Sequence, residues 1–336
     1  MRAVLSARGM RAVLSARGLR VAAPGPDGPV TLVDGVSLDL LAGETLGLVG
    51  ESGCGKSLTA HALIDLVPGP ARLLEGSVLL EGRELVGQDP AAMCRVRGAR
   101  VALVPQDSSA ALDPVRRVGW QVAETLRAHE PLPRGEAGRR AAAALAEVGV
   151  TRDDHPHRLS GGQRQRAMIA MALGPGPAVL LADEPTSALD APMQVQVLDL
   201  IDRRREELGL AVLLISHDVG AVARLSQRVA VMYAGRIVEE GPAGAVLSAP
   251  RHPYTAGLLA SVPRLDQRHR RRPPIAGSPP EPGRLPPGCA FAPRCPARRL
   301  ECDAAPPPLR EIGDERRVAC VLGPAEAAAG IMRWRG

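Results

Sequence analysis

The chain has 336 residues, which is enough for one large domain or two ordinary ones. Hydrophobic residues make up 45% of it and can build a core, but aromatic residues make up only 1%, so that core must consist of Leu, Val, Ala and Met. The formal net charge of +6 permits contact with anionic lipid or nucleic acid without requiring it. No run reaches the roughly 18 apolar residues of a transmembrane helix, and no secretory signal is visible. We therefore expect a cytoplasmic protein, with any membrane role supplied by partner subunits.

The first 18 residues contain a duplication, because residues 1–9 (MRAVLSARG) are identical to residues 10–18. A copy of nine residues is too short to be a structural repeat unit. We interpret it as a duplicated start, with Met10 as a candidate initiator. Because chain termini are usually loose, we predict that residues 1–18 form a disordered leader; an ordered extension is the alternative.

A glycine-rich motif follows, Gly50-Glu51-Ser52-Gly53-Cys54-Gly55-Lys56-Ser57, which fits G-x-x-x-x-G-K-[ST]. The preceding residues 45–49 are expected to form a short buried strand, and residues 56–67 a helix, which is the context that a phosphate-binding loop requires. Glycines let the backbone approach a ligand closely, with amide groups facing its phosphates. The residues predicted to bind the nucleotide are Gly50, Glu51, Ser52, Gly53, Cys54, Gly55, Lys56, Ser57 and Leu58.

Lys56 is the only lysine in a chain whose other basic residues are arginines. A compact ammonium can sit between the β- and γ-phosphates of a nucleotide, where a planar guanidinium fits poorly. The Ser57 hydroxyl would bind Mg²⁺. Together they indicate a nucleoside triphosphate site, and a chance match in a glycine-rich chain is the alternative for this motif taken alone.

Two acidic residues follow a second apolar segment, residues 178–182, which is expected to form a strand. Carboxylates are useful at the carboxyl end of a strand, where α/β folds bind ligands. We predict that Asp183 holds Mg²⁺ through water and that Glu184 polarises the water that attacks the γ-phosphate. The next predicted strand, residues 211–216, ends at His217, which can hydrogen-bond the γ-phosphate; a satisfied surface histidine is the alternative.

The segment LSGGQRQR at residues 159–166 opens a predicted helix that runs through Leu173. It resembles the signature motif of ATP-binding-cassette (ABC) ATPases, and the family's other motifs follow in order over about residues 19–245. Gln106 matches the Q-loop, which is catalytic and contacts Mg²⁺, Asp190 matches the D-loop, and His217 matches the switch histidine. By resemblance, the signature residues that bind ATP in an opposing subunit are Leu159, Ser160, Gly161, Gly162 and Gln163.

This resemblance implies an α/β fold: a P-loop NTPase (RecA-like) ABC ATPase core with an antiparallel β subdomain and an α-helical signature subdomain. Helical patterns at residues 118–129 and 135–148 are similar to that helical subdomain. Two ATP molecules would be sandwiched in a head-to-tail dimer, with Mg²⁺, and Glu184, His217 and Gln106 would act in hydrolysis. The chain departs from the family near Ala23, where an aromatic residue usually stacks on adenine.

The predicted cassette spans residues 19–250, and residues 251–336 form a C-terminal extension. Its segment HPYT at residues 252–255, followed by LLASVP at 258–263, is similar to the ATPase subunits of oligopeptide and dipeptide importers and of related nickel importers. Residues 264–288 are rich in Pro and Arg and are expected to form an extended linker. The arginine run at 270–272 could touch lipid headgroups, with a solvated linker charge as the preferred alternative.

Four cysteines lie in the C-terminal extension: Cys289, Cys295, Cys302 and Cys320. Disulfides are unfavourable in a cytosolic protein, whereas a cage of four thiolates suits an iron–sulfur cluster or zinc. The run Gly288–Pro296 resembles the cysteine motif of the peptide-importer ATPases, where a [4Fe–4S] cluster occurs in some members. We favour that cluster over zinc, and free structural thiols are the third alternative.

Taken together, these motifs predict the ATPase subunit of a bacterial ABC importer for oligopeptides or dipeptides. The resemblance implies two transmembrane permease subunits, a second ATPase subunit and an extracytoplasmic solute-binding protein as partners, with no nucleic acid. The chain would be a peripheral protein on the cytoplasmic face of the inner membrane. The alternatives are an importer ATPase for another cargo such as nickel, and a soluble ABC ATPase without a transport role.

Overall fold

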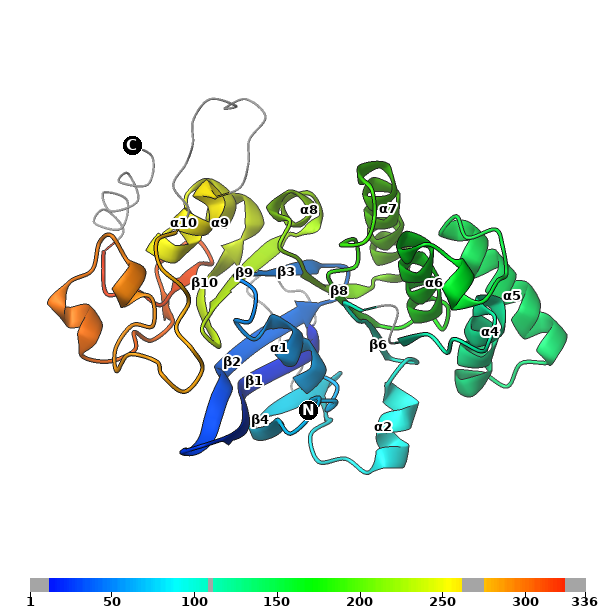
Figure 1. The fold of residues 1–336 in the computed structure, drawn as a ribbon, viewed down its shortest axis with the longest axis horizontal. Helices are drawn as coiled ribbons and strands as arrows, with labels where there is room; N and C mark the ends of the chain where they lie inside the picture. Colours follow the sequence, from blue (N-terminus) through cyan, green and yellow to red (C-terminus); the bar gives the residue numbers. More distant parts are fainter. Residues whose placement is uncertain (1–11, 108–110, 262–274, 324–336) are drawn as a thin grey trace. The chain divides into compact units, whose positions relative to one another are not determined.

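The structure is a computed structural model that describes residues 12–107, 111–261 and 275–323 (Figure 1). The chain divides into two compact units, each assembled from separate stretches of sequence. The described part of the first unit comprises residues 12–15, 39–45 and 78–216. The second unit comprises residues 16–38, 46–77 and the described residues from 217 onward.

The first unit contains three parallel strands in the order β8-β7-β6. They are β6 (Val101–Val104), β7 (Val179–Asp183) and β8 (Ala211–Ile215). Every residue of β7 and β8 is buried, as expected for parallel strands that are covered on both faces. Because parallel strands share a direction, the carboxyl end of β7, which carries Asp183, lies at the same edge as the ends of its neighbours.

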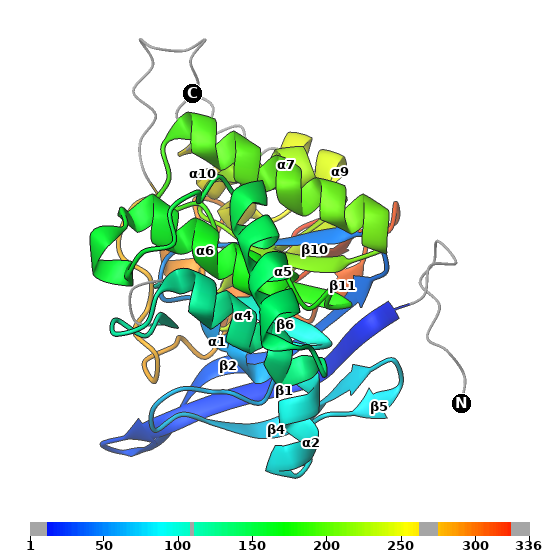
Figure 2. The ribbon, with the colours of Figure 1, turned by 90° about the vertical axis from the view of Figure 1, so that its right-hand side faces the viewer.

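The helices of the first unit are α2 (Pro90–Val96), α4 (Val118–His129), α5 (Arg134–Glu147), α6 (Gly161–Leu173) and α7 (Ala191–Leu208), with a 3₁₀ turn at Pro156–Arg158. Figure 2 shows α4, α5 and α6 packed side by side. This group is the predicted helical signature subdomain. Helices α4 and α5 begin and end within one residue of the predicted bounds, and α6 begins two residues later than predicted and ends at Leu173 as predicted.

Five strands of the second unit are neighbours in one sheet, in the order β11-β12-β10-β9-β3. They are β3 (Thr45–Val49), β9 (Arg228–Tyr233), β10 (Arg236–Pro242), β11 (Arg310–Glu311) and β12 (Arg317–Val318). β3 and β9 are parallel, whereas the other neighbours are antiparallel. Its helices are α1 (Lys56–Ala62), α8 (Val219–Leu225), α9 (Ala243–Ser248) and α10 (Pro253–Ala260), with 3₁₀ turns at Ala292–Arg294 and Leu300–Asp303.

A separate sheet with the order β2-β1-β4-β5 corresponds to the predicted antiparallel subdomain. It consists of β1 (Ala12–Gly25), β2 (Gly28–Leu41), β4 (Arg72–Leu80) and β5 (Arg83–Glu84). The prediction of a disordered leader over residues 1–18 is wrong for residues 12–18, which belong to β1; residues 1–11 lie outside the described residues. The strand forms because Val13 and Leu14 are buried and the Val13 carbonyl accepts a hydrogen bond from the Glu81 amide at 2.7 Å.

Helix α1 is shorter than the predicted residues 56–67, because it ends at Ala62. Asp65 has a left-handed backbone with φ of 51°, which an α-helix cannot include. Val67 precedes Pro68, and a residue before proline is driven away from helical angles. The phosphate loop is therefore followed by two helical turns and then a turn in the chain.

The C-terminal region is attached to the second unit through the fully buried Glu239 on β10. The carboxylate of Glu239 accepts hydrogen bonds from the backbone amides of Arg251 and His252, each at 2.8 Å, and pairs with Arg316 at 2.5 Å. The ring of His252 then accepts a bond from the Tyr254 amide at 3.1 Å and caps α10. The HPYT segment therefore begins a helix whose entry is fixed by a buried acid.

We predict that His252 makes the protein less stable in mild acid. Burial lowers its pKa from 6.5 to about 4, so the unfolded chain takes up the proton first as the pH falls. The free energy of unfolding should therefore drop between pH 6.5 and pH 4, by up to about 3 kcal/mol. Urea unfolding at several pH values checks this against His252→Asn, which keeps a capping acceptor. Equal pH slopes in the two proteins would contradict the assignment.

Candidate nucleotide-binding site

The phosphate loop lies in the second unit, between β3 and α1, as predicted. Its shape depends on glycine. Gly53 and Gly55 have left-handed backbones with φ of 78° and 104°. A Cβ atom on Gly50 would lie 2.2 Å from the carbonyl oxygen of Met232 on β9. Position 50 therefore has no room for any side chain, and the backbone angles at positions 53 and 55 favour glycine.

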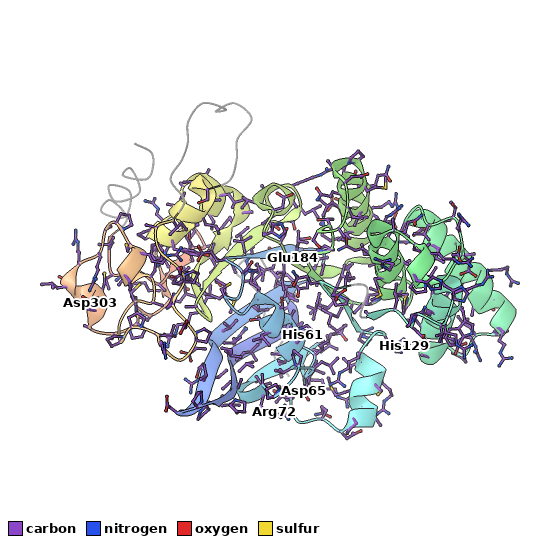
Figure 3. All side chains as sticks on the ribbon, viewed as in Figure 1. His61, Asp65, Arg72, His129, Glu184 and Asp303 are labelled. Atoms are coloured by element: carbon purple, nitrogen blue, oxygen red, sulfur yellow. The ribbon has the colours of Figure 1, made fainter. Side chains whose placement is uncertain are left out.

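Lys56 is buried, with 7% of its surface exposed, and it lies inside the loop. Its Nζ donates hydrogen bonds to the carbonyl oxygens of Gly50 at 2.8 Å and Glu51 at 2.9 Å. Ser57 follows it, and His61, on α1 (Figure 3), places its Nδ1 2.8 Å from the Ser57 carbonyl oxygen. The ammonium can exchange the two carbonyl oxygens for phosphate oxygens when an anion arrives.

Glu51, the second residue of the loop, is held at each of its polar groups. Its carbonyl oxygen accepts from Lys56, and its amide donates to the hydroxyl of Tyr254 at 2.8 Å. Its carboxylate accepts two bonds from the Arg294 guanidinium, at 2.7 and 3.0 Å. The hydrogen bond to Glu51 raises the pKa of Arg294, which stays charged. Sequence reasoning missed these two partners; the only signal was that Tyr254 and Arg294 belong to the HPYT and cysteine motifs.

In the first unit, the structure brings Gln106 and Glu184 together. Glu184 directly follows β7 (Figure 3), and its Oε2 accepts a hydrogen bond from Gln106 Nε2 at 3.3 Å. Glu184 has a φ of 49°, which costs a non-glycine residue about 1 kcal/mol or more. Its amide donates to the carbonyl of Ile215 on β8 at 2.9 Å, which holds this conformation. Strain of this kind is typical of residues whose side chain must point in one particular direction.

Gln165 is a further site residue to which the sequence motifs assigned no role. It is 1% exposed and lies on α6. Its Nε2 donates to the carbonyl oxygen of Glu184 at 2.9 Å, and its Oε1 accepts from the Ala188 amide at 3.2 Å. One side chain thus connects the signature helix to the candidate base and to the D-loop, within the first unit.

The signature motif forms the start of α6. Ser160 is the N-cap, with its hydroxyl accepting from the Gln163 amide at 3.2 Å and its own amide donating to the Gln163 side chain at 2.9 Å. A Cβ on Gly162 would lie 2.9 Å from Leu189, so glycine permits this close packing on the D-loop. Asp190 caps α7 by accepting from the Met193 amide at 3.0 Å.

Two further predicted residues, Asp183 and His217, lie at or just after the ends of strands. Asp183 is the last residue of β7 and is 2% exposed. His217 follows β8 by two residues, belongs to the second unit and is exposed. Cys54 is buried in the phosphate loop, and burial raises the pKa of its thiol, as expected for a small core residue rather than a nucleophile.

The four C-terminal cysteines line one small cavity in the second unit, of about 10 Å³. All four carry free thiols, and burial raises the pKa of three of them, with that of Cys295 raised to about 12. Among the residues that the structure describes, no three or more His, Cys, Asp or Glu side chains are close enough to hold a metal ion. Thiols are donors of the type that zinc and iron–sulfur clusters use, but the sulfurs of these four cysteines are not in ligand geometry.

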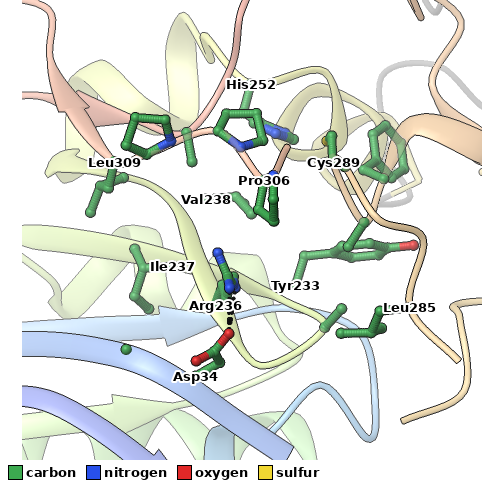
Figure 4. Close-up of a pocket in the computed structure, with 18 of the residues that line it drawn as sticks. Asp34, Tyr233, Arg236, Ile237, Val238, His252, Leu285, Cys289, Pro306 and Leu309 are labelled. Atoms are coloured by element: carbon green, nitrogen blue, oxygen red, sulfur yellow. Dashed lines mark hydrogen bonds and ion pairs between the residues drawn. The ribbon is translucent and has the colours of Figure 1, made fainter. Parts of the chain in front are cut away.

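A larger cavity of about 430 Å³ adjoins the cysteine region in the second unit (Figure 4). Its walls include Tyr233, His252 and Cys289, together with Arg236, whose Nε donates to the Asp34 carboxylate at 2.9 Å. The segment 275–288 carries no helix or strand, as predicted, and most of its residues are exposed; only its two ends, Ile275 at 8% exposed and Gly288, are buried. The run 270–272 lies outside the described residues.

No helix within residues 12–107, 111–261 and 275–323 combines the length and the apolar character needed to cross a membrane.

Comparison with known proteins agrees with this geometry. The model of the ABC transporter family matches residues 33–187, and that of the oligopeptide/dipeptide transporter C-terminal region matches residues 238–302. The oligopeptide transport ATP-binding protein OppD of Mycobacterium tuberculosis is 45% identical over 315 residues, which cover 91% of this chain. The chain spans only about half of that relative, 51% of its length.

Two further matches cover nearly the whole of the other protein. The oligopeptide transport ATP-binding protein AppD of Bacillus subtilis is 42% identical over 306 residues, 89% of this chain and 93% of the relative. The solved dimer of the bacterial ABC transporter cassette MJ0796 is 25% identical, with a TM-score of 0.63 over 68% of this chain and 98% of that one. The chain therefore belongs to the ABC transporter ATPases, with the C-terminal region of the oligopeptide/dipeptide type.

Proposed function

We propose that this chain hydrolyses ATP to power the uptake of oligopeptides or dipeptides across the cytoplasmic membrane. The observation that carries the proposal is the combination of a complete set of cassette motifs with the oligopeptide/dipeptide C-terminal region at residues 238–302. The names of the relatives in Mycobacterium tuberculosis and Bacillus subtilis, both oligopeptide transport ATP-binding proteins, support the same cargo class.

In the proposed reaction, Lys56 and the loop amides bind the β- and γ-phosphates, and Glu184 accepts the proton of the attacking water. Gln106 holds the Glu184 carboxylate from one side, while Gln165 fixes its backbone. His217 hydrogen-bonds the γ-phosphate. The protein's task is to position groups around a charged transition state, because there is little covalent chemistry for side chains to perform.

Mg²⁺ belongs to this proposal as a cofactor. Ser57, Gln106 and Asp183 offer oxygen donors, which are the ligands that this hard cation prefers. Asp183 supports the assignment by its position, because it is the last residue of a buried strand, at the strand end where α/β folds bind ligands. When bound, Mg²⁺ neutralises charge that develops on the phosphates.

Transport requires partners, because the described chain has no spanning helix. We infer a second ATPase subunit, bound head to tail, whose signature residues Ser160 and Gly162 complete the opposite ATP site. Ser160 is exposed at the start of α6, so its hydroxyl and the first amides of the helix are accessible to such a partner. Two permease subunits and an extracytoplasmic binding protein complete the importer, which places this chain at the cytoplasmic face of the membrane.

The cysteine region is proposed to hold a metal centre, a [4Fe–4S] cluster in preference to zinc. Four thiols around one cavity support a thiolate cage. Either metal centre requires the four sulfurs to rearrange, because they are not in ligand geometry. The role we assign is structural. The region has few regular elements beyond two-residue strands and 3₁₀ turns, so a metal centre would stabilise it by linking four points of the chain.

Glu184→Gln should lower the steady-state ATPase rate by about a hundredfold or more, because an amide cannot accept the proton. It should still bind ATP and should accumulate as the ATP-bound dimer. ATPase assays with size-exclusion chromatography in ATP test this. Lys56→Ala is the contrasting variant, expected to lose both hydrolysis and dimer formation. Normal turnover of Glu184→Gln would remove Glu184 from the role of base.

The transport proposal is tested by purifying the tagged chain from its native membrane and identifying co-purified proteins by mass spectrometry. We expect two permease subunits and a peptide-type binding protein. A nickel-type binding protein would change the cargo and keep the importer. Recovery of only soluble or nucleic-acid partners would overturn the transport role and leave the ATPase assignment intact.

Cys295→Ser should lose the bound metal, since one of four ligands is removed. Anaerobic preparations are analysed for iron, sulfide and zinc and by visible absorbance. Iron with sulfide identifies the cluster, and one zinc ion per chain identifies the alternative. Cys94→Ser, at an exposed cysteine on α2, is the matched control and should keep its metal. A metal-free wild-type protein would contradict the metal centre.

A further inference from the structure

We propose that Arg294 and Tyr254 are positioning residues for ATP binding, which act by holding Glu51 of the phosphate loop. The inference rests on the assignment of that loop as the ATP site. It gives the C-terminal region a direct part in nucleotide affinity, separate from any contact with permeases and from the metal centre.

The first argument is the number of contacts that converge on one residue. The C-terminal region supplies two of the four partners of Glu51: the Tyr254 hydroxyl for its amide and the Arg294 guanidinium for its carboxylate. The other two, Lys56 and the Cys54 amide, belong to the loop itself and bond to the Glu51 carbonyl oxygen. Lys56 must leave that oxygen to reach phosphate, so Tyr254 and Arg294 are the partners from outside the loop that can persist when ATP binds.

The second argument is electrostatic. Glu51 places a carboxylate, 24% exposed, in a loop that must bind a polyanion. Like charges at this range repel and would weaken ATP binding. Arg294 is 5% exposed and makes a two-pronged ion pair with Glu51, so the negative charge is balanced where solvent screens it poorly. Because the Glu51–Arg294 pair is neutral, the charge that remains in the loop is the positive charge of Lys56, which attracts a triphosphate.

The third argument is that Arg294 is itself held in place before ATP arrives. Its Nε donates to the Ala276 carbonyl at 2.9 Å, and a terminal nitrogen donates to the Gly277 carbonyl at 3.2 Å. A further bond reaches the Tyr233 hydroxyl at 3.2 Å, and the guanidinium stands 6.0 Å from the Phe291 ring centre. A side chain with this many contacts is fixed in advance, which lowers the entropic cost of binding.

The same region lines the loop elsewhere in the second unit. A cavity of about 240 Å³ has walls formed by residues 51–54 of the loop and by residues 279–282 of the C-terminal region. The C-terminal region therefore faces the loop across this cavity as well as contacting it through the Arg294–Glu51 pair.

The test measures kcat and KM for ATP in the full-length protein for Arg294→Gln, Glu51→Gln and the double variant. Arg294→Gln should raise KM for ATP about tenfold or more, because it leaves the Glu51 charge unbalanced beside the phosphates, with kcat changed less than about twofold. The double variant, with neither charge, should recover to within about threefold of wild type. Arg298→Gln, whose exposed pair with Asp303 lies in the same region, is the matched control and should leave KM unchanged.

Tyr254→Phe keeps the ring and removes only the hydroxyl, so it tests the second contact in a protein expected to fold. It should also raise KM with little effect on kcat. A wild-type KM in both Arg294→Gln and Tyr254→Phe overturns the inference, as does a double variant no better than Arg294→Gln. If Arg294→Gln fails to fold, Tyr254→Phe alone decides. Lys56→Ala is measured in parallel. If Lys56→Ala still hydrolyses ATP, the assignment of the loop as the ATP site is rejected. If Lys56→Ala loses hydrolysis while the Arg294 and Tyr254 variants keep a wild-type KM, only this inference is rejected.

Discussion

A loop that binds phosphate through its backbone must keep its amide groups available while its conformation stays fixed. Gly53 and Gly55 meet the first requirement, since they allow backbone angles that turn amides toward a ligand. The same freedom would leave the ligand-free loop poorly ordered. The second requirement is met by contacts from outside the loop, on Glu51 and at Gly50, where the backbone of β9 approaches closely. Strand β9 and the C-terminal region supply these contacts, to Gly50 and to Glu51 respectively.

One acid organises each unit, in a different way: Glu239 is fully buried, whereas Glu184 is half-buried. In the second unit, Glu239 joins β10 to the start of α10 and to Arg316 on the chain just before β12. In the first unit, Glu184 is held through its backbone by Ile215 and Gln165, which leaves its carboxylate oriented by Gln106. The carboxylate of Glu239 accepts bonds from two backbone amides and from Arg316. Glu184, the candidate catalytic acid, has its backbone fixed and its side chain partly accessible. This difference separates the two roles more clearly than burial alone.

The sequence predicts the parts of this protein that depend on local patterns. Strand β3, helix α4 and helix α6 lie where apolar periodicity and motifs place them, and the phosphate loop has the expected strand–loop–helix context. The structure differs from the sequence prediction where contacts with residues far apart in the sequence determine the conformation. Residues 12–18 are ordered because they join a sheet, which no nine-residue pattern indicates. The contacts of Glu51 with Arg294 join residues 243 positions apart, so only the fold reveals them.

The pairing of β12 with β10 also bears on whether this sheet can pair edge to edge with another chain. Glu239 pairs with Val318 and Glu240 with Arg317, so β12 covers the middle of the outer side of β10. Beyond them, β11 is only two residues long and is exposed. Short edge strands are poor templates for a second chain. A chain cut at residue 250 would instead present the seven-residue β10 as a bare edge and would leave Glu239 without Arg316. The C-terminal region therefore also hinders β10 from pairing with a strand of another chain.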